Sequence, residues 1–225
     1  MGNIIQERGS VVEYNYIFFD LDGTIYDSAR GITASARYAL RKMNIAVTDD
    51  ETLNKFIGPP LKKSFMDFYG MTSEEGDRAV GFYREYYVEN GIFDGKLYDN
   101  AAETLKMMYD YGIKIVLATS KPQIFAERIL KYFKIDQYFV FVSGASLDEK
   151  HVEKSDIISY AVNKLGITDL NSVLMVGDRN FDITGAKAVG VKSAGVLFGY
   201  GEKQELIDAG ADYIVKTFNE LFEII

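Results

Sequence analysis

Short, continuous runs of apolar residues organise this chain. Four of them combine β-branched and aromatic side chains, and they cover residues 16–19, 114–118, 139–142 and 172–176. Runs without polar alternation are typical of strands that are buried on both faces of a parallel sheet. Two weaker runs, residues 192–197 and 211–215, predict two further strands of the same sheet.

Between these runs lie stretches in which apolar residues recur with a helical period. Residues 101–108, 122–132 and 156–165 predict helices. Ser120 and Ser155 are the expected N-caps of the second and third of these helices. Because strands and helices alternate, we expect the α/β fold class, with a doubly wound, Rossmann-like parallel sheet and right-handed crossovers.

One stretch interrupts this alternation. Residues 28–96 contain helical signals and no credible strand, and Thr72 with Glu75 forms a predicted capping box at the start of one helix. We therefore expect two domains. An α/β core would comprise residues 1–27 and 97–225, and an inserted all-helical domain would comprise residues 28–96.

Composition narrows the possible partners. The 225 residues carry 33 acidic and 25 basic side chains, for a net charge of -8, which disfavours nucleic acid and anionic membranes as partners. No cysteine is present, and His151 is the single histidine, so disulfides and multi-His or Cys metal sites are excluded. No apolar run approaches the roughly 20 residues of a membrane helix. We expect a soluble, cytoplasmic protein, as a monomer or a small homo-oligomer.

The most informative segment follows the first apolar run. Asp20 and Asp22 leave the end of a predicted buried strand, and the chain continues directly into Gly23 and Thr24. In open α/β sheets, ligands bind at the carboxyl ends of the strands. Taken alone, the segment fits a functional site and an Asp-rich turn that only closes a strand about equally well.

A second acidic cluster follows the fourth apolar run. Asp178 and Asp182 lie four residues apart, and Asp182 would also suit the first turn of a helix. Two strands that both end in carboxylates would concentrate like charges at one sheet edge, which is costly unless a cation lies among them. Because the available ligands are hard oxygens, Mg²⁺ is the expected ion.

Candidate anion-binding groups lie on two further segments. Thr119 and Ser120 end the second apolar run and offer hydroxyl and backbone N–H groups at a predicted helix N-terminus, although an ordinary N-cap would use the same residues. Lys154 precedes another predicted helix, which is an unfavourable end of the helix dipole for a cation. A bound anion would relieve that conflict.

Together these segments resemble the four motifs of the haloacid dehalogenase superfamily. The motifs are Asp-x-Asp-Gly-Thr from Asp20, the strand-ending Thr119, the downstream Lys154, and Gly-Asp-x-x-x-Asp over residues 177–182. They occur in the right order over nearly the whole chain, and the insertion at residues 28–96 resembles the C1 cap of that superfamily. Among its members, the chain is most similar to phosphoglycolate phosphatase-like proteins, including relatives described as 5′-nucleotidases.

The resemblance implies an Mg²⁺-dependent phosphatase that hydrolyses a small phosphate monoester, of the phosphoglycolate or nucleoside monophosphate type. It implies that Asp20 is the nucleophile that becomes an aspartyl phosphate, and that Asp22 is the acid/base. The implied phosphate-binding residues are Thr119, Ser120, Lys154, Gly23 and Thr24, and the implied Mg²⁺ ligands are Asp20, the backbone carbonyl of Asp22, Asp178 and Asp182.

Two parts of this assignment leave alternatives. The family often has Lys-Pro where this chain has Lys154 followed by Ser155, so Lys121 and Lys150 remain alternatives for the phosphate-binding lysine. Substrate contacts from the insertion are expected from the helix-breaking segment around Gly58 and Pro59 and from Lys62 after it, with Lys121 as a further candidate. Residues 82–87 are aromatic, and their helical spacing favours packing within the insertion over stacking on a ligand.

Two other functions use similar residues. A phosphomutase on the same scaffold is scarcely separable from a hydrolase by sequence. A phospho-receiver domain would need an Asp after the third strand, and residues 141–144 contain none. A dinucleotide-binding loop is not supported either, because Gly199-Tyr200-Gly201 lacks a third glycine.

Overall fold

The computed structural model describes residues 14–47, 49–147 and 153–225. Its main sheet is parallel, with strand order β5-β4-β1-β6-β7-β8. All six predicted strands form, and the α/β, Rossmann-like fold class is confirmed. The strands are β1 (Tyr16–Phe19), β4 (Lys114–Pro122), β5 (Phe139–Ala145), β6 (Val173–Gly177), β7 (Lys192–Val196) and β8 (Tyr213–Val215).

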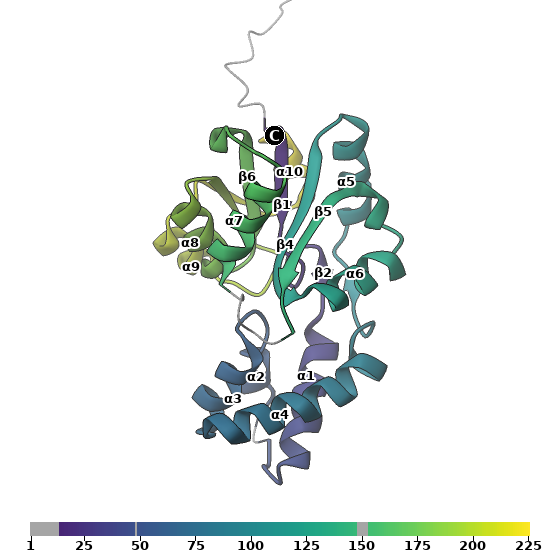
Figure 1. Cartoon of the computed structure of the whole chain (residues 1–225), viewed down its shortest axis with the longest axis vertical. Coiled ribbons are helices and arrows are strands. Elements are labelled where there is room, and N and C mark those ends of the chain that lie inside the picture. The colour runs from purple at the N-terminus through teal and green to yellow at the C-terminus, as the bar shows by residue number, and fades with distance from the viewer. Residues whose placement is uncertain (1–13, 48, 148–152) are drawn as a thin grey trace, which may run out of the picture.

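Helices cover both faces of this sheet (Figure 1). Alternate residues of β1 point to opposite layers, so Ile17 and Phe19 pack in one apolar cluster while Phe18 packs in another. The first cluster includes residues of α5 (Ala101–Asp110), α6 (Gln123–Tyr132) and α10 (Phe218–Glu223), and the second includes residues of α7 (Lys154–Lys164) and α8 (Asn180–Val189). The short helix α9 (Lys203–Ala209) lies beside α8.

The strand order creates a switch point at the centre of the sheet. After β1 the chain builds β4 and β5 on one side, and it then returns to place β6 on the other side. Phe19 is in register with Leu117 of β4 and with Val176 of β6. The carboxyl ends of β1 and β6 therefore lie side by side, at the position where open α/β sheets bind ligands.

A helical segment is inserted between two very short strands, β2 (Tyr26–Asp27) and β3 (Lys96–Leu97). These strands pair with each other in antiparallel register, so the two connections to the helices run together. In Figure 1 the helices of this segment lie beyond the lower end of the main sheet. They are α1 (Ala29–Lys42), α2 (Asp50–Asn54), α3 (Leu61–Tyr69), α4 (Ser73–Tyr86) and the π-helical turn η1 (Tyr87–Gly91).

This arrangement supports our proposal that residues 28–96 form a cap domain and that residues 1–27 and 97–225 form the core. The predicted capping box is present, since the Thr72 N–H donates to the Glu75 carboxylate at 2.9 Å and the Glu75 N–H donates to the Thr72 hydroxyl at 3.3 Å. No helix in the described ranges is long and apolar enough to cross a membrane.

Two predicted N-caps are wrong. Ser120 caps no helix, because pairing with β5 extends β4 to Pro122, and Pro122 itself occupies the N-cap position of α6. Ser155 is not a cap either, because α7 begins one residue earlier, at Lys154, with Glu153 at its N-cap. Both differences lie at segment ends, where local sequence specifies the boundary poorly.

Candidate active site

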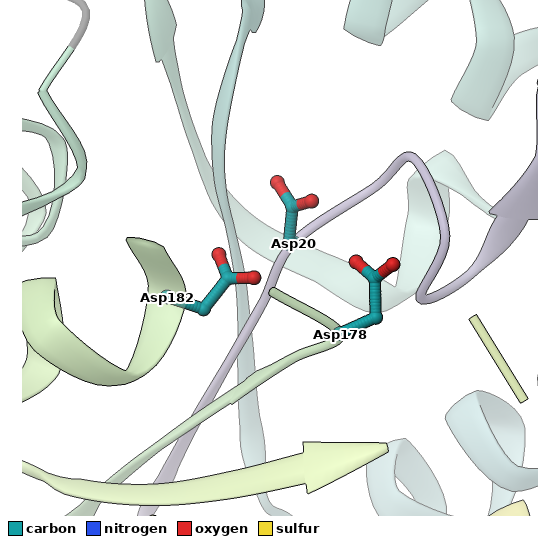
Figure 2. Close-up of side chains that lie close together, drawn as sticks. All are labelled: Asp20, Asp178 and Asp182. Carbon is teal, nitrogen blue, oxygen red and sulfur yellow. The ribbon is translucent and has the colours of Figure 1, made fainter. Parts of the chain in front are cut away.

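Three buried carboxylates meet at the switch point. Asp20 directly follows β1, Asp178 directly follows β6, and Asp182 lies in the first turn of α8. One carboxylate oxygen from each lies within 4.8 Å of the others. Figure 2 shows the three side chains gathered at the ends of the two neighbouring strands. The expected juxtaposition of the two acidic segments is thus observed.

The electrostatics of this acidic cluster fit a cation. Burial raises the pKa of Asp178 well above its usual range, and the carboxylates of Asp182 and Asp20 raise it further. Burial also raises the pKa of Asp182, although Lys154 opposes that shift. Three hard oxygen donors that are costly to ionise together match the ligand preference of Mg²⁺.

The ammonium of Lys154 contacts two members of this cluster. Its Nζ lies 2.7 Å from Asp20 Oδ1 and 2.7 Å from Asp182 Oδ1, and it donates to the Ala118 carbonyl at 3.1 Å. The side chain is almost fully buried. A Cβ at Gly185 would lie only 2.8 Å from Lys154 Cβ, so α8 needs glycine where the lysine passes. Lys150, the alternative nearby in sequence, and His151 lie outside the described residues.

A second, largely buried ion pair also lines the site. Lys121 Nζ is 2.6 Å from Asp22 Oδ2 and 5.2 Å from the centre of the Tyr87 ring. Burial lowers the pKa of Lys121, but the Asp22 carboxylate and the nearby Tyr83 outweigh it, and the net shift is upward. Asp22 Oδ1 is buried and has no hydrogen-bond partner among the described residues. Lys121 therefore forms its ion pair with Asp22, whereas the ammonium that pairs with Asp20 is that of Lys154.

Two of the predicted phosphate-binding residues lie against Asp178 and do not face the pocket. Gly23 has φ +86°, and a Cβ there would lie 2.2 Å from Asp178 Oδ2. Its N–H donates to the Tyr26 carbonyl at 2.9 Å. The Thr24 hydroxyl donates to Asp178 Oδ1 at 3.4 Å. Neither Gly23 nor Thr24 lines the pocket, because their turn folds back to support Asp178.

A pocket opens between the acidic cluster and the helical segment, with a volume of about 100 Å³. Thr119 and Ser120 line it from the end of β4, and the Thr119 hydroxyl accepts the Lys121 N–H at 3.2 Å. The carboxylates of Asp20 and Asp22 face it as well. On the helical side the lining includes Phe56, Gly58, Pro59, Tyr83, Arg84 and Tyr87.

Some of the residues of the helical segment that were predicted to contact the substrate line the pocket, and others do not. Gly58 and Pro59 line the pocket, but Lys62 does not, because its ammonium pairs with Asp77 at 2.8 Å on the neighbouring helix. Tyr83 and Tyr87 do pack within the segment, with ring centres 5.4 Å apart, yet both also line the pocket. The Tyr87 hydroxyl is buried and has no hydrogen-bond partner in the described part of the chain.

Two arginines that sequence reasoning missed tie the helical segment to the sheet. Arg84 donates to the Leu147 carbonyl at 3.0 Å, and Arg179 donates to the Ile57 carbonyl at 2.9 Å. Both arginines also line the pocket. No local pattern marks them, because each contact joins residues more than 60 positions apart.

The site and the fold define a hydrolase that belongs to a known class. Residues 17–196 match the family described as haloacid dehalogenase-like hydrolase, and the chain belongs to this family. A crystal structure described as a predicted phosphatase from Clostridium acetobutylicum superposes with a TM-score of 0.90 at 45% identity, over 94% of this chain and 97% of that one. The phospho-receiver alternative is thereby set aside.

Curated relatives agree with the expected subgroup. A 5′-nucleotidase from Pseudomonas aeruginosa is 36% identical over 88% of this chain and 90% of its own length. A phosphoglycolate phosphatase from Colwellia psychrerythraea is 28% identical over 93% of this chain and 96% of its own length. The Tyrosine-protein kinase PtkA from Mycobacterium tuberculosis is 35% identical over 89% of this chain and 65% of its own length. Phosphoryl chemistry is common to all three names.

Proposed function

We propose that the protein is an Mg²⁺-dependent phosphatase that hydrolyses a small phosphate monoester through an aspartyl phosphate on Asp20. One observation carries this proposal. Asp20 lies within an acidic cluster that a single ammonium bridges, while the neighbouring Asp22 faces the same pocket in a separate ion pair. Two carboxylates, two residues apart, therefore have environments suited to two different roles.

In the first step an oxygen of the Asp20 carboxylate attacks the phosphorus of the bound monoester. The bond from phosphorus to the ester oxygen breaks, and Asp22, protonated at that stage, gives its proton to the leaving alkoxide. Lys154 and the Thr119 hydroxyl would hold phosphoryl oxygens, since both groups lie at the end of the pocket that contains Asp20. Their positive potential offsets the charge of the transferring group.

In the second step a water molecule attacks phosphorus in the aspartyl phosphate. Asp22, now a carboxylate, takes the proton of that water, and the bond from phosphorus to the Asp20 oxygen breaks. Inorganic phosphate leaves, and both side chains return to their starting states. Lys121 lies 2.6 Å from Asp22 and would hold its carboxylate toward the attacking water in this step.

Asp20 and Asp178 would hold Mg²⁺, with the Asp22 carbonyl as a third protein ligand and Asp182 as a ligand or a support for one. When bound, the ion neutralises charge on the phosphoryl oxygens and on the attacking carboxylate. The residues present fit this ion, since burial and mutual repulsion already make the metal-free cluster costly to ionise.

The substrate that we propose for this pocket is a small phosphorylated metabolite. The carboxylates of Asp20 and Asp22 face the pocket, and a second cavity of about 340 Å³ adjoins it at Gly58, Ser120 and Lys154. Phosphoglycolate and nucleoside monophosphates are both candidate substrates for a site of this kind. Cap opening and closure would exclude water during the first step.

A phosphate-release assay tests the proposal. Phosphoglycolate, nucleoside 5′-monophosphates and sugar phosphates should be compared with Mg²⁺, after chelation and after readdition of the ion. We expect release that needs Mg²⁺, and poor support by Ca²⁺, whose looser coordination would misplace the nucleophile. Full activity after exhaustive chelation would contradict the proposal, and isomerisation of a sugar phosphate without free phosphate would favour a phosphomutase.

A further inference from the structure

The turn Gly199-Tyr200-Gly201, which follows β7, has no role in the chemistry described so far. Its Tyr200 contacts two distant parts of the site at once. The backbone of this residue reaches the acidic cluster, and its side chain reaches the first connection between the sheet and the helical segment.

The backbone contact is close and needs both glycines. The Tyr200 N–H donates to Asp178 Oδ2 at 2.8 Å. A Cβ on Gly199 would lie 2.2 Å from the Gly23 carbonyl oxygen, and a Cβ on Gly201 would lie 1.8 Å from the Asp178 carbonyl oxygen. The turn is therefore fixed against the loop that carries Asp178, because no larger residue could approach it so closely.

The phenol makes three hydrogen bonds at the start of the helical segment. Its hydroxyl donates to Asp27 Oδ1 at 2.8 Å and accepts the N–H groups of Ser28 at 2.8 Å and Ala29 at 3.0 Å. The Ser28 side chain makes no capping hydrogen bond to α1. The Tyr200 hydroxyl thus accepts N–H groups at the start of the helix that begins the cap domain, beside Asp27 Oδ1, which accepts the Ala29 N–H at 3.4 Å.

We propose that Tyr200 is a positioning residue that couples occupancy of the metal site to the connection between β2 and α1. This inference rests on the Mg²⁺ site of the proposed function. A cation that draws the Asp178 carboxylate toward itself acts on the Tyr200 N–H, and the fixed turn transmits that change to the phenol. The phenol then acts on Asp27 and on the first N–H groups of α1.

Hydrogen exchange of the intact protein, with and without Mg²⁺, tests this coupling. In the wild type, Mg²⁺ should slow exchange in a peptide that spans residues 24–33. In Tyr200→Phe, which removes only the hydroxyl, this Mg²⁺-dependent protection should be lost while Mg²⁺ affinity stays within about twofold, because the contact to Asp178 is a backbone one. The variant's kcat should fall by up to about tenfold, because the three hydrogen bonds that the hydroxyl makes at the start of the helical segment are lost.

Tyr213→Phe is the matched control. Its hydroxyl accepts a hydrogen bond from Tyr14 at 3.2 Å, and Tyr213 lies on β8 and does not line the pocket. This variant should keep the Mg²⁺-dependent protection of residues 24–33 and the wild-type kcat. The wild-type exchange measurement stands by itself if Tyr200→Phe does not fold.

The outcomes separate this inference from the function on which it rests. If calorimetry shows no Mg²⁺ binding to the wild type, the metal site and the coupling both fail. If Mg²⁺ binds but leaves exchange of residues 24–33 unchanged, or if Tyr200→Phe keeps the protection, only the coupling is overturned. A loss of Mg²⁺ affinity much larger than twofold in Tyr200→Phe would also overturn it, since the phenol would then support the metal site itself.

Discussion

Two lysine–aspartate pairs line one pocket, and their surroundings differ. We call the surroundings of Lys154 and Asp20 the acidic side and those of Lys121 and Asp22 the balanced side. Lys154 contacts Asp20 but also Asp182, so a single ammonium faces the three carboxylates of the acidic cluster. Lys121 contacts Asp22 alone and lies over the Tyr87 ring. Around Lys154, the carboxylates therefore outnumber the ammonium groups, whereas Lys121 and Asp22 carry one charge of each sign.

In the proposed reaction, this difference would separate the site of the transferring phosphoryl group from the site of the leaving alcohol. The acidic side gains from a divalent cation and from the phosphoryl group that the cation accompanies. The balanced side, walled by the aromatic residues Tyr83 and Tyr87, suits the departing alcohol and the residue that protonates it. The following changes should affect the two sides differently.

Replacing the nucleophile should have the largest effect. Asp20→Asn should reduce turnover to below about one percent of the wild type, because an amide is a poor nucleophile and a weaker metal ligand. Phosphate release under steady-state conditions measures this. Asp110→Asn, which changes an exposed carboxylate on α5, is the control and should leave turnover unchanged. A higher residual rate, with deamidation excluded, would remove Asp20 from the role.

The two lysines should differ in size and kind of effect. Lys154→Ala should lower kcat by roughly 10²–10³-fold, the usual consequence of losing one charged donor to the transition state. This loss should be similar for alkyl and p-nitrophenyl esters. Lys121→Ala should cost about tenfold or less, and mainly with alkyl esters, whose leaving groups need the Asp22 proton.

Kinetics with both esters on both variants measure this contrast. If Lys121→Ala proves the crippling change while Lys154→Ala stays within about threefold of the wild type, the phosphate contact belongs to the turn at the end of β4. The phosphoryl group would then bind beside Lys121, and the leaving group would lie beside Lys154.

Removing one carboxylate from the acidic side should stabilise the metal-free protein. The pKa of Asp178 is raised in the folded state, so its ionisation opposes folding as the pH rises above the ordinary Asp value of about 3.9. Asp178→Asn lacks this penalty. Its Tm without metal should exceed that of the wild type by about 2–4 °C for each kcal/mol regained.

This Tm difference should grow as the pH rises above about 4, because the unfolded carboxyl ionises there while the folded one resists ionisation. Thermal unfolding in chelator measures it. The same variant should lose Mg²⁺-dependent activity. A Tm difference that shrinks with rising pH would contradict the crowding of charge on this side.

The balanced side offers a smaller test. The buried Tyr87 hydroxyl has no hydrogen-bond partner among the residues that the structure describes, so Tyr87→Phe should raise the Tm slightly by removing an unsatisfied group. If the leaving group of the substrate takes this hydrogen bond, KM should rise while kcat changes little. Tyr26→Phe is the matched comparison. The Tyr26 hydroxyl donates to the Ile92 carbonyl at 3.1 Å, so its removal should lower the Tm.

The two sides also differ in how far sequence could predict them. The apolar runs before Asp20 and Asp178 specify buried parallel strands, and parallel strands bring their carboxyl ends to one edge. The acidic cluster therefore followed from local patterns. The assignment of Lys154 depended on the family resemblance, since its one local signal was an unfavourable place at the N-terminal end of a predicted helix.

The balanced side depends on how distant segments dock. Lys121 and Asp22 lie 99 positions apart, and their pairing follows from the extension of β4 past Ser120, which sequence did not indicate. The helical spacing around Tyr87 predicted packing but not the pocket that the packing encloses. The contacts of the Tyr200 hydroxyl could not be predicted for the same reason, since its partners are more than 170 positions away.

The central claim is that Asp20 carries the phosphoryl group while Asp22 carries the proton. Asp22→Asn with p-nitrophenyl phosphate tests it most directly, because this leaving group needs no proton. A pre-steady-state experiment with excess substrate should show a burst of p-nitrophenolate followed by slow turnover, and mass spectrometry of the quenched protein should locate the phosphoryl group on Asp20. A steady-state rate equal to the wild type, or a phosphoryl group on any other residue, would contradict the account.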